Sequence, residues 1–244
     1  MKNEKKRWCT NKALFEKNGN VVKKSYFRVG NAFKDYLLLT LIKKYYPKKL
    51  YCGYWYNAIE TCSCCQKENS FKMRFIDGKS LKEAFYENKR SDVFFHAGYW
   101  LGIFHKATKD QKGRVMVFND YNVSNILIDT KKKIVVALDP GNYSTINTNP
   151  SNSIFIIILS IVRCVFKKNI KYILPSVKAF FHGYWLSGEK NKIKLESGAR
   201  YLMHRFKNGE SRTLINEPKF ARMITGIMET FAIYSIIFYE YRLK

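Results

Sequence analysis

The chain has 244 residues, of which 46% are hydrophobic, so it can bury a substantial core and is not a disordered protein. Lysine and arginine number 44 against 19 aspartates and glutamates, and the formal charge of +25 predicts anionic partners such as nucleotide phosphates, nucleic acid or a membrane. Because the lysines are scattered along the chain, a solvated basic surface explains the charge equally well.

No export signal is visible at the N-terminus, since MKNEKKRWC carries charge without a following apolar core, and a cytoplasmic location is expected. The apolar stretch Ile154 to Phe166 is too short to span a bilayer, and Met223 to Tyr239 is near the lower limit and contains Glu229. Both are interpreted as buried helices. Peripheral contact with the inner face of a membrane stays open.

Six cysteines are expected to be reduced in a cytoplasmic chain. Three of them form the cluster TCSCC, at Cys62, Cys64 and Cys65. Paired C-x-x-C knuckles are missing, and neighbouring thiols do not easily enter one tetrahedron, so core or loop thiols are favoured over a zinc site.

In the first half of the chain we expect a hairpin, then one helix, then two further strands. The Asn-Gly turn in KALFEKNGNVVKKSYF predicts a hairpin. In GNAFKDYLLLTLIKKYY, apolar residues recur at helical spacing until Pro47 ends the pattern, which predicts a helix. KLYCGYWYNAIETC and FKMRFIDGK then predict two further strands.

After Asp77-Gly78 the pattern becomes mainly helical. SLKEAFYENK and DVFFHAGYWLGIFHKATK predict helices, and VMVF, NILIDT and KIVVALD predict short strands, the last two joined at Lys131 to Lys133. From Ser153 onward we expect helices linked at Pro175, Gly188 and Asn208-Gly209. The order predicts an α+β fold with a small N-terminal β-sheet lobe, a hinge near 74–78 and a larger, mainly helical C-terminal lobe.

Three oxygen-bearing side chains border the predicted strands of VFNDYNVSNILIDTKKKIVVALDPGN. Asp120 is followed by Asn125, and Asp139 comes after the next strand. Phosphoryl transfer from ATP needs a carboxylate beside the attacking hydroxyl, hard oxygen ligands for Mg²⁺ and a cation over the phosphates. A hairpin between Asn125 and Asp139 would return the second carboxylate to the first, so the order fits this chemistry.

The segments NDYNVSNILID and VVALDPG resemble the catalytic and metal-binding loops of the protein-kinase-like superfamily, in its aminoglycoside phosphotransferase, choline kinase and lipopolysaccharide-core kinase branches. RFIDGKSL resembles the hinge of that group, and AGYWLGIFHKAT resembles its helix before the catalytic loop. The resemblance covers roughly residues 20–142. It implies a bilobal fold, with a nucleotide-binding lobe at 1–77 and a catalytic and acceptor-binding lobe at 78–244.

By this resemblance, Asp120 is the catalytic base, and Asn125 and Asp139 are the ligands of Mg²⁺. The strand lysine that contacts the phosphates of ATP is matched by Lys23, with Lys24 as its competitor.

The partner acid of this lysine is expected on the following helix, where Asp35 fits best. The family normally has glutamate there, and the shorter arm of aspartate requires closer packing.

The sequence departs from the family pattern in three places. Phe118 replaces a histidine before the catalytic aspartate, and Pro140 replaces a phenylalanine before the glycine of the metal loop. A glycine-rich phosphate loop is missing, because Gly19 is the only glycine before Gly30. Covering of the phosphates would fall to Thr10, Asn11 and Lys12, or to no residue at all.

Each motif also has an ordinary structural explanation. Asp120 and Asn125 suit turns, as does Asp139-Pro140-Gly141, and His105 suits a packed helix end. The agreement of order, spacing and bordering strands favours an ATP- and Mg²⁺-dependent phosphotransferase acting on an alcohol, such as a sugar of a lipopolysaccharide or glycolipid, or a small molecule. The alternatives are a catalytically silent, kinase-like binding protein and a protein that binds nucleic acid through charge alone.

Overall fold

The computed structural model describes residues 6–9, 13–27, 31–117, 121–138, 149–188, 194–207 and 233–237. Lys23, Asp35 and Asn125 fall within these ranges, whereas Asp120 and Asp139 lie outside them. The chain folds into two compact units. The first comprises Met1–Lys89 and Phe118–Ser144, and the second comprises Arg90–Val117 and Thr145–Lys244.

An antiparallel sheet of five strands forms one part of the first unit. Its order is β1 (Lys6–Cys9), β2 (Ala13–Asn18), β3 (Val21–Tyr26), β7 (Ser70–Arg74) and β6 (Thr61–Cys65). The predicted hairpin is confirmed as β2 and β3, and Gly19 in its turn has a φ of 58°, which glycine adopts without steric cost. The buried residues of β3 are Val22, Lys24 and Tyr26, so its even-numbered side chains point inward.

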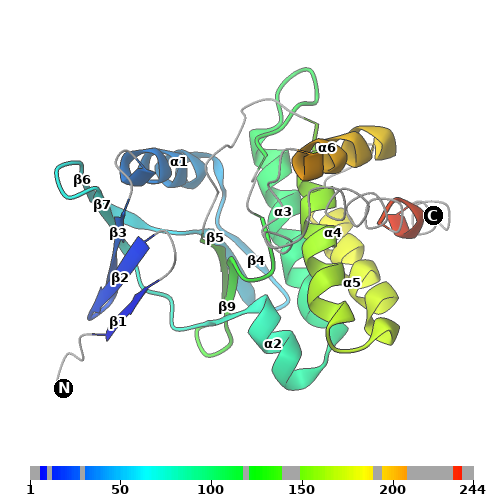
Figure 1. Ribbon diagram of the computed structural model, residues 1–244, viewed down its shortest axis with the longest axis horizontal. Helices are drawn as coiled ribbons and strands as arrows, with labels where there is room; N and C mark the ends of the chain where they lie inside the picture. Colours follow the sequence, from blue (N-terminus) through cyan, green and yellow to red (C-terminus); the bar gives the residue numbers. More distant parts are fainter. Residues whose placement is uncertain are drawn as a thin grey trace. The chain divides into compact units, whose positions relative to one another are not determined.

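The predicted helix is confirmed as α1 (Asn31–Tyr45), which contacts β3, β6 and β7 and also β5 (Figure 1). Leu39 and Ile42, spaced for one helical face, are both buried. This helix follows β3 directly in the sequence and covers the sheet to which β3 belongs. It therefore brings its own side chains to the inward-facing residues of β3.

A second sheet of five strands completes the first unit. Its order is β4 (Lys49–Tyr51), β5 (Tyr54–Ala58), β10 (Ile134–Ala137), β9 (Ile126–Asp129) and β8 (Lys79–Ser80). The prediction of a single strand over KLYCGYWYNAIETC is wrong, because Cys52 and Gly53 take positive φ values and close a hairpin between β4 and β5. β10 pairs antiparallel with β9 and parallel with β5.

Residues 75–78 connect the two sheets, and α2 (Leu81–Asn88) follows β8 immediately. Gly78 passes so close to β9 that an added Cβ would lie 2.8 Å from the carbonyl oxygen of Ile128. The lobe boundary predicted at residue 77 differs from the observed units, because the pairing of β8 and β5 with the 126–137 hairpin keeps these segments together. The predicted functional roles of the two lobes stay predictions.

In its described residues the second unit is mainly helical. Its helices are η1 (Ser91–Phe94), α3 (Phe95–Thr108), α4 (Ser151–Phe166), η2 (Ile170–Tyr172), α5 (Ile173–Leu186) and α6 (Leu195–Lys207), with α3, α4 and α5 side by side (Figure 1). A further short helical segment lies at 233–237. Pro175 does not link two helices as predicted but lies in the first turn of α5, where its missing N–H needs no partner. Residues 115–117 are buried but form only a single bridge at Val115, so the predicted VMVF strand is not formed there.

Glycines allow α3 and α5 to pack closely. An added Cβ at Gly98 would overlap the carbonyl oxygen of Phe180, and one at Gly183 would overlap that of Phe95. Both helices also carry fully buried aromatic side chains, among them Trp100 on α3 and Tyr184 on α5. The two sheets with their helix and the helical unit together confirm the predicted α+β fold class.

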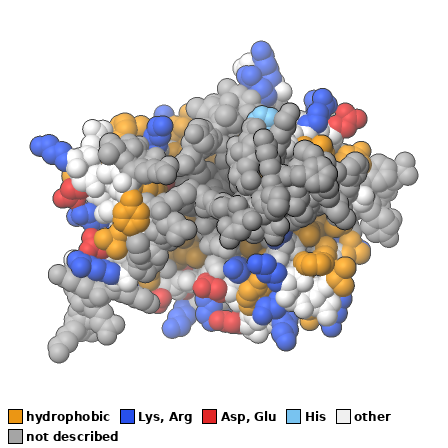
Figure 2. Space-filling view, viewed as in Figure 1, with side chains coloured by type: hydrophobic (Ala, Val, Ile, Leu, Met, Phe, Trp, Pro, Cys, Tyr) orange, Lys and Arg blue, Asp and Glu red, His pale blue; other side chains and the backbone are white. Residues whose placement is uncertain are grey.

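Basic side chains are spread over the described surface. Figure 2 shows lysine and arginine at several separate places on the viewed face, with acidic side chains among them. Within the described part of the chain, no helix combines the length and the hydrophobicity that a membrane span requires.

Candidate active site

The inner face of the first sheet carries a buried ion pair between β3 and α1. The Nζ of Lys24 lies 3.3 Å from the Oδ2 of Asp35, and only 7% of Lys24 and 3% of Asp35 are exposed. The hydroxyl of Tyr26 donates a hydrogen bond to the same carboxylate oxygen. A buried charge requires such partners, because leaving one unpaired would cost several kcal/mol, on the order of 3–5.

Aromatic rings surround the amine of Lys24. Its Nζ lies 4.6 Å from the ring centroid of Tyr26, 5.8 Å from that of Phe15 and 5.9 Å from that of Phe71. Phe15 and Phe71 are the direct neighbours of Lys24 on β2 and β7, so they share its face of the sheet. Lysine over aromatic faces gains a favourable electrostatic contact. The amine is therefore held from one side by a carboxylate and from others by rings.

Lys23 lies on the opposite face of β3. Its Nζ pairs with the Oε2 of Glu68 at 2.6 Å, and this hydrogen bond raises the pKa of Lys23 and lowers that of Glu68. Of the two adjacent lysines, the structure therefore brings Lys24 to Asp35 and turns Lys23 away. The sequence predicted Lys23 for the inward position with Lys24 as competitor, because the two valines before them fit either phase of the alternation.

Asn69, which sequence reasoning did not identify, connects the end of β3 to the start of α1. Its Nδ2 donates to the carbonyl of Tyr26 at 3.0 Å, and its Oδ1 accepts from the N–H of Ala32 at 3.3 Å. The N–H groups in the first turn of a helix have no partner inside the helix, and Asn69 Oδ1 supplies one for the N–H of Ala32. Asn69 thereby fixes α1 beside β3 and helps to set the position of Asp35.

Asn125 lies at the start of the β9 and β10 hairpin, as predicted. Its carbonyl accepts from the N–H of Leu138 at 2.8 Å, which extends the ladder that pairs Ile126 with Ala137. The hairpin therefore brings Leu138 back beside Asn125. Leu138 directly precedes Asp139, the second predicted metal ligand, in the sequence. Asp120 and Asp139 lie outside the described residues, and their roles stay predictions.

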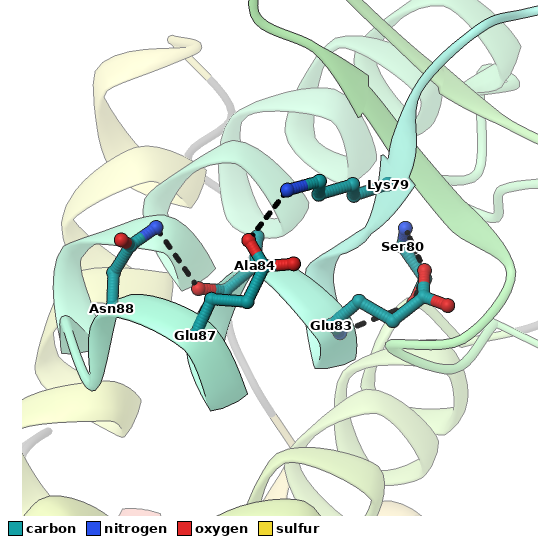
Figure 3. Close-up of polar contacts among 6 residues, drawn as sticks. All are labelled: Lys79, Ser80, Glu83, Ala84, Glu87 and Asn88. Atoms are coloured by element: carbon teal, nitrogen blue, oxygen red, sulfur yellow. Dashed lines mark hydrogen bonds and ion pairs between the residues drawn. The ribbon is translucent and has the colours of Figure 1, made fainter.

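The loop before this hairpin is supported by α2. The N–H of Lys82 donates to the carbonyl of Val123 at 3.2 Å. The helix begins with a capping box, in which Ser80 accepts from the N–H of Glu83 and Glu83 accepts from the N–H of Ser80 at 2.8 Å (Figure 3). Because Ser80 also pairs with Leu127 of β9, the cap joins the helix to the strand that follows Asn125.

The β6 cysteines lie at one edge of the first sheet. Cys64 is half-buried beside Phe71, and burial raises the pKa of its thiol, whereas Cys62 and Cys65 are exposed. Across the described ranges, no three histidine, cysteine or acidic side chains are placed to share a metal ion.

His105 is buried in the last turn of α3. Its Nδ1 lies 2.9 Å from the hydroxyl of Tyr184 on α5, and burial lowers its pKa to about 3. Its Nε2 has no hydrogen-bond partner among the residues that the structure describes. A neutral, buried ring of this kind packs α3 against α5. The sequence predicted a histidine at the helix end, as observed, but expected it to pack the catalytic loop.

Comparisons with known proteins give a match in structure but none in sequence. No family model matches the chain, and no curated protein matches it. Among solved structures, it is similar to a choline/ethanolamine kinase family protein from Mesorhizobium loti, with a TM-score of 0.56 and 11% identity, over 95% of this chain and 88% of that chain. The chain therefore shares the fold of that protein, in agreement with the bilobal, kinase-like fold that its catalytic-loop sequence predicted.

Proposed function

We propose that the protein is an ATP- and Mg²⁺-dependent phosphotransferase that transfers the γ-phosphoryl group to an alcohol. The observation that carries this proposal is the buried pair of Lys24 and Asp35 between β3 and α1. In a kinase-like fold, a lysine paired with an acid of the following helix is the cation that contacts the phosphates of ATP. A merely structural chain has little reason to bury a lysine where an apolar residue would stabilise the core equally well.

The roles of the residues follow from their chemistry. Lys24, in place of Lys23, would contact the α- and β-phosphates, with Asp35 and Tyr26 holding its side chain. The amide oxygen of Asn125 and the carboxylate of Asp139 are hard donors that fit Mg²⁺, which when bound neutralises the charge of the β- and γ-phosphates. Asp120 would orient the acceptor hydroxyl and accept its proton.

We further propose that the acceptor is a sugar of a lipopolysaccharide or glycolipid, or a small hydroxyl-bearing molecule. The formal charge of +25 supports an anionic acceptor. The enzyme would act in the cytoplasm, and nucleic acid is the less favoured partner because the sequence has neither a zinc knuckle nor an RNA-binding aromatic signature.

A catalytically silent, kinase-like binding protein is the second candidate. The observation that favours it is the missing glycine-rich phosphate loop, since Gly19 is the only glycine before Gly30 in the sequence. Such a protein would bind Mg²⁺ and ATP through Lys24 and Asn125 and would release ATP unchanged.

Incubation of the purified protein with γ-labelled ATP, Mg²⁺ and a fractionated extract of its own cells tests the proposal. Label is expected in one lipid, glycan or small-molecule fraction. Asp120→Asn should abolish this transfer and leave ATP affinity almost unchanged, whereas Lys24→Met should weaken ATP binding itself. Binding of Mg²⁺ and ATP with no label in any fraction would support the silent protein. Absence of both binding and transfer would overturn the proposal.

A further inference from the structure

The turn between α4 and α5 exposes three large apolar side chains within nine residues. Phe166 is 64% exposed, Ile170 is 68% exposed and Leu174 is 37% exposed. We call residues 166–174 the α4–α5 tip. Single exposed apolar residues are common on protein surfaces, but several gathered on one turn mark an interaction site.

The apolar residues of the tip alternate with cations. Lys167, Lys168 and Lys171 are all exposed, and the Nζ of Lys171 lies 5.2 Å from the ring centroid of Tyr172. The sequence from residue 140 to residue 188 contains no aspartate or glutamate. The helices α4, η2 and α5, which form the tip and its two flanks, therefore carry no acidic side chain of their own.

Backbone hydrogen bonds hold the tip in one conformation. The N–H groups of Lys168 and Asn169 donate to the carbonyl of Val165 at 2.8 and 3.0 Å, and the Oδ1 of Asn169 accepts from the N–H of Lys171 at 2.9 Å. Asn169 thus caps η2 directly after α4 ends. Because the turn is already ordered, the exposed side chains lose little backbone freedom when they bind a partner.

We propose that the α4–α5 tip is a membrane-docking site that binds an anionic lipid surface. Phe166 and Ile170 enter the headgroup region, while Lys167, Lys168 and Lys171 lie against the anionic headgroups. Apolar side chains interleaved with lysines suit the boundary between lipid tails and charged headgroups, whereas a protein interface core is depleted of lysine. The tip belongs to the second unit, whereas Lys24, Asp35 and Asn125 belong to the first, and the proposal adds a location to the proposed activity.

Sedimentation of the full chain with phosphatidylcholine vesicles, with and without phosphatidylglycerol, tests the proposal. Binding is expected only with phosphatidylglycerol and should weaken as salt is raised. Replacing Lys167, Lys168 and Lys171 together with glutamine should weaken partitioning by about 100-fold. Phe166→Ser combined with Ile170→Ser should weaken it roughly 10-fold or more.

Leu50→Ser is the matched control, because Leu50 on β4 is 56% exposed and belongs to the first compact unit. It should leave vesicle binding unchanged, and all variants should keep the wild-type melting temperature, since the substituted side chains are exposed. Equal binding to pure phosphatidylcholine, or wild-type binding by the Phe166/Ile170 variant, would overturn the proposal. A change of oligomeric state in that variant without a change in vesicle binding would instead make the tip a contact between copies. Phosphoryl transfer measured without vesicles is independent of all these outcomes.

Discussion

Lys24→Met tests the buried pair that carries the proposed function. The attraction across the 3.3 Å between Lys24 Nζ and Asp35 Oδ2 is about 5 kcal/mol at an effective dielectric constant of about 20, before desolvation is counted. The substitution removes the cation and leaves Asp35 buried with the Tyr26 hydroxyl still donating to it. We therefore expect the free energy of unfolding to fall by about 3 kcal/mol, near the lower end for a broken buried pair.

Thermal unfolding measures this loss, which corresponds to a melting temperature lower by roughly 10 °C for a chain of this size. Lys23→Met is the matched control on the neighbouring residue, whose partner Glu68 is exposed, and its melting temperature should stay at the wild-type value. Combining Lys24→Met with Asp35→Leu should restore part of the stability, because no unpaired charge then remains. ATP binding should be weakened in both variants that lack Lys24. A Lys24→Met protein that melts and binds ATP like the wild type, or a larger loss in Lys23→Met, would refute the assignment.

Four other predictions concern stability. Ser80→Ala removes the α2 cap and should lower the free energy of unfolding in urea by about 1 kcal/mol. The hydrogen bonds from Ser80 lower the pKa of Glu83, so the contribution of Glu83 to stability is complete above its ordinary pKa of 4.5 and is lost as the pH falls through the folded value. The free energies of unfolding of the wild type and of Glu83→Gln should converge at that low pH. A difference between them that stays constant with pH would contradict this. Burial lowers the pKa of His105 from 6.5 to about 3, so between these values the unfolded chain binds a proton that the folded chain excludes. In that window the free energy of unfolding should fall by about 1.4 kcal/mol for each unit by which the pH is lowered. Urea titrations at several pH values should show that this dependence on pH is shallower by the same amount in His105→Gln. Gly98→Ala should destabilise the protein by about 3 kcal/mol through overlap with α5, whereas Gly53→Ala, which adds a Cβ in open space at positive φ, should lose only about 1 kcal/mol; equal losses would contradict the close packing.

Local signals predicted much of the fold. The Asn-Gly turn gave the hairpin of β2 and β3, and the apolar spacing before Pro47 gave α1. These elements depend on neighbours in the sequence, so their patterns are visible without the fold. The parallel pairing of β5 with β10 depends on residues far apart in the chain, and no local pattern indicates it. The same long-range pairing explains why the observed units differ from a division at residue 77.

The candidate site shows the same limit at the scale of single residues. Order and spacing indicated Asn125 and Asp35 as candidates, and their roles stay predictions. Alternation alone left Lys23 and Lys24 undecided, and in the structure it is Lys24 that is buried beside Asp35. Asn69 was missed because its function consists of two hydrogen bonds to distant backbone groups. Asparagine adopts positive φ more readily than most residues, and Asn69 does so here. This preference was the one available sequence signal, and it predicts only a turn.

The central position of β10 in its sheet also constrains how the protein can be synthesised. β5 pairs with β10, and β8 pairs with β9. Neither pair can form until the ribosome has synthesised α3 and the segment after it, because β9 and β10 come later in the chain. An N-terminal fragment ending at Lys89 would carry β5 with an open edge, which is a template for aggregation. Nascent chains of this protein should therefore need protection until translation passes the second hairpin, and refolding should be limited by that late strand addition.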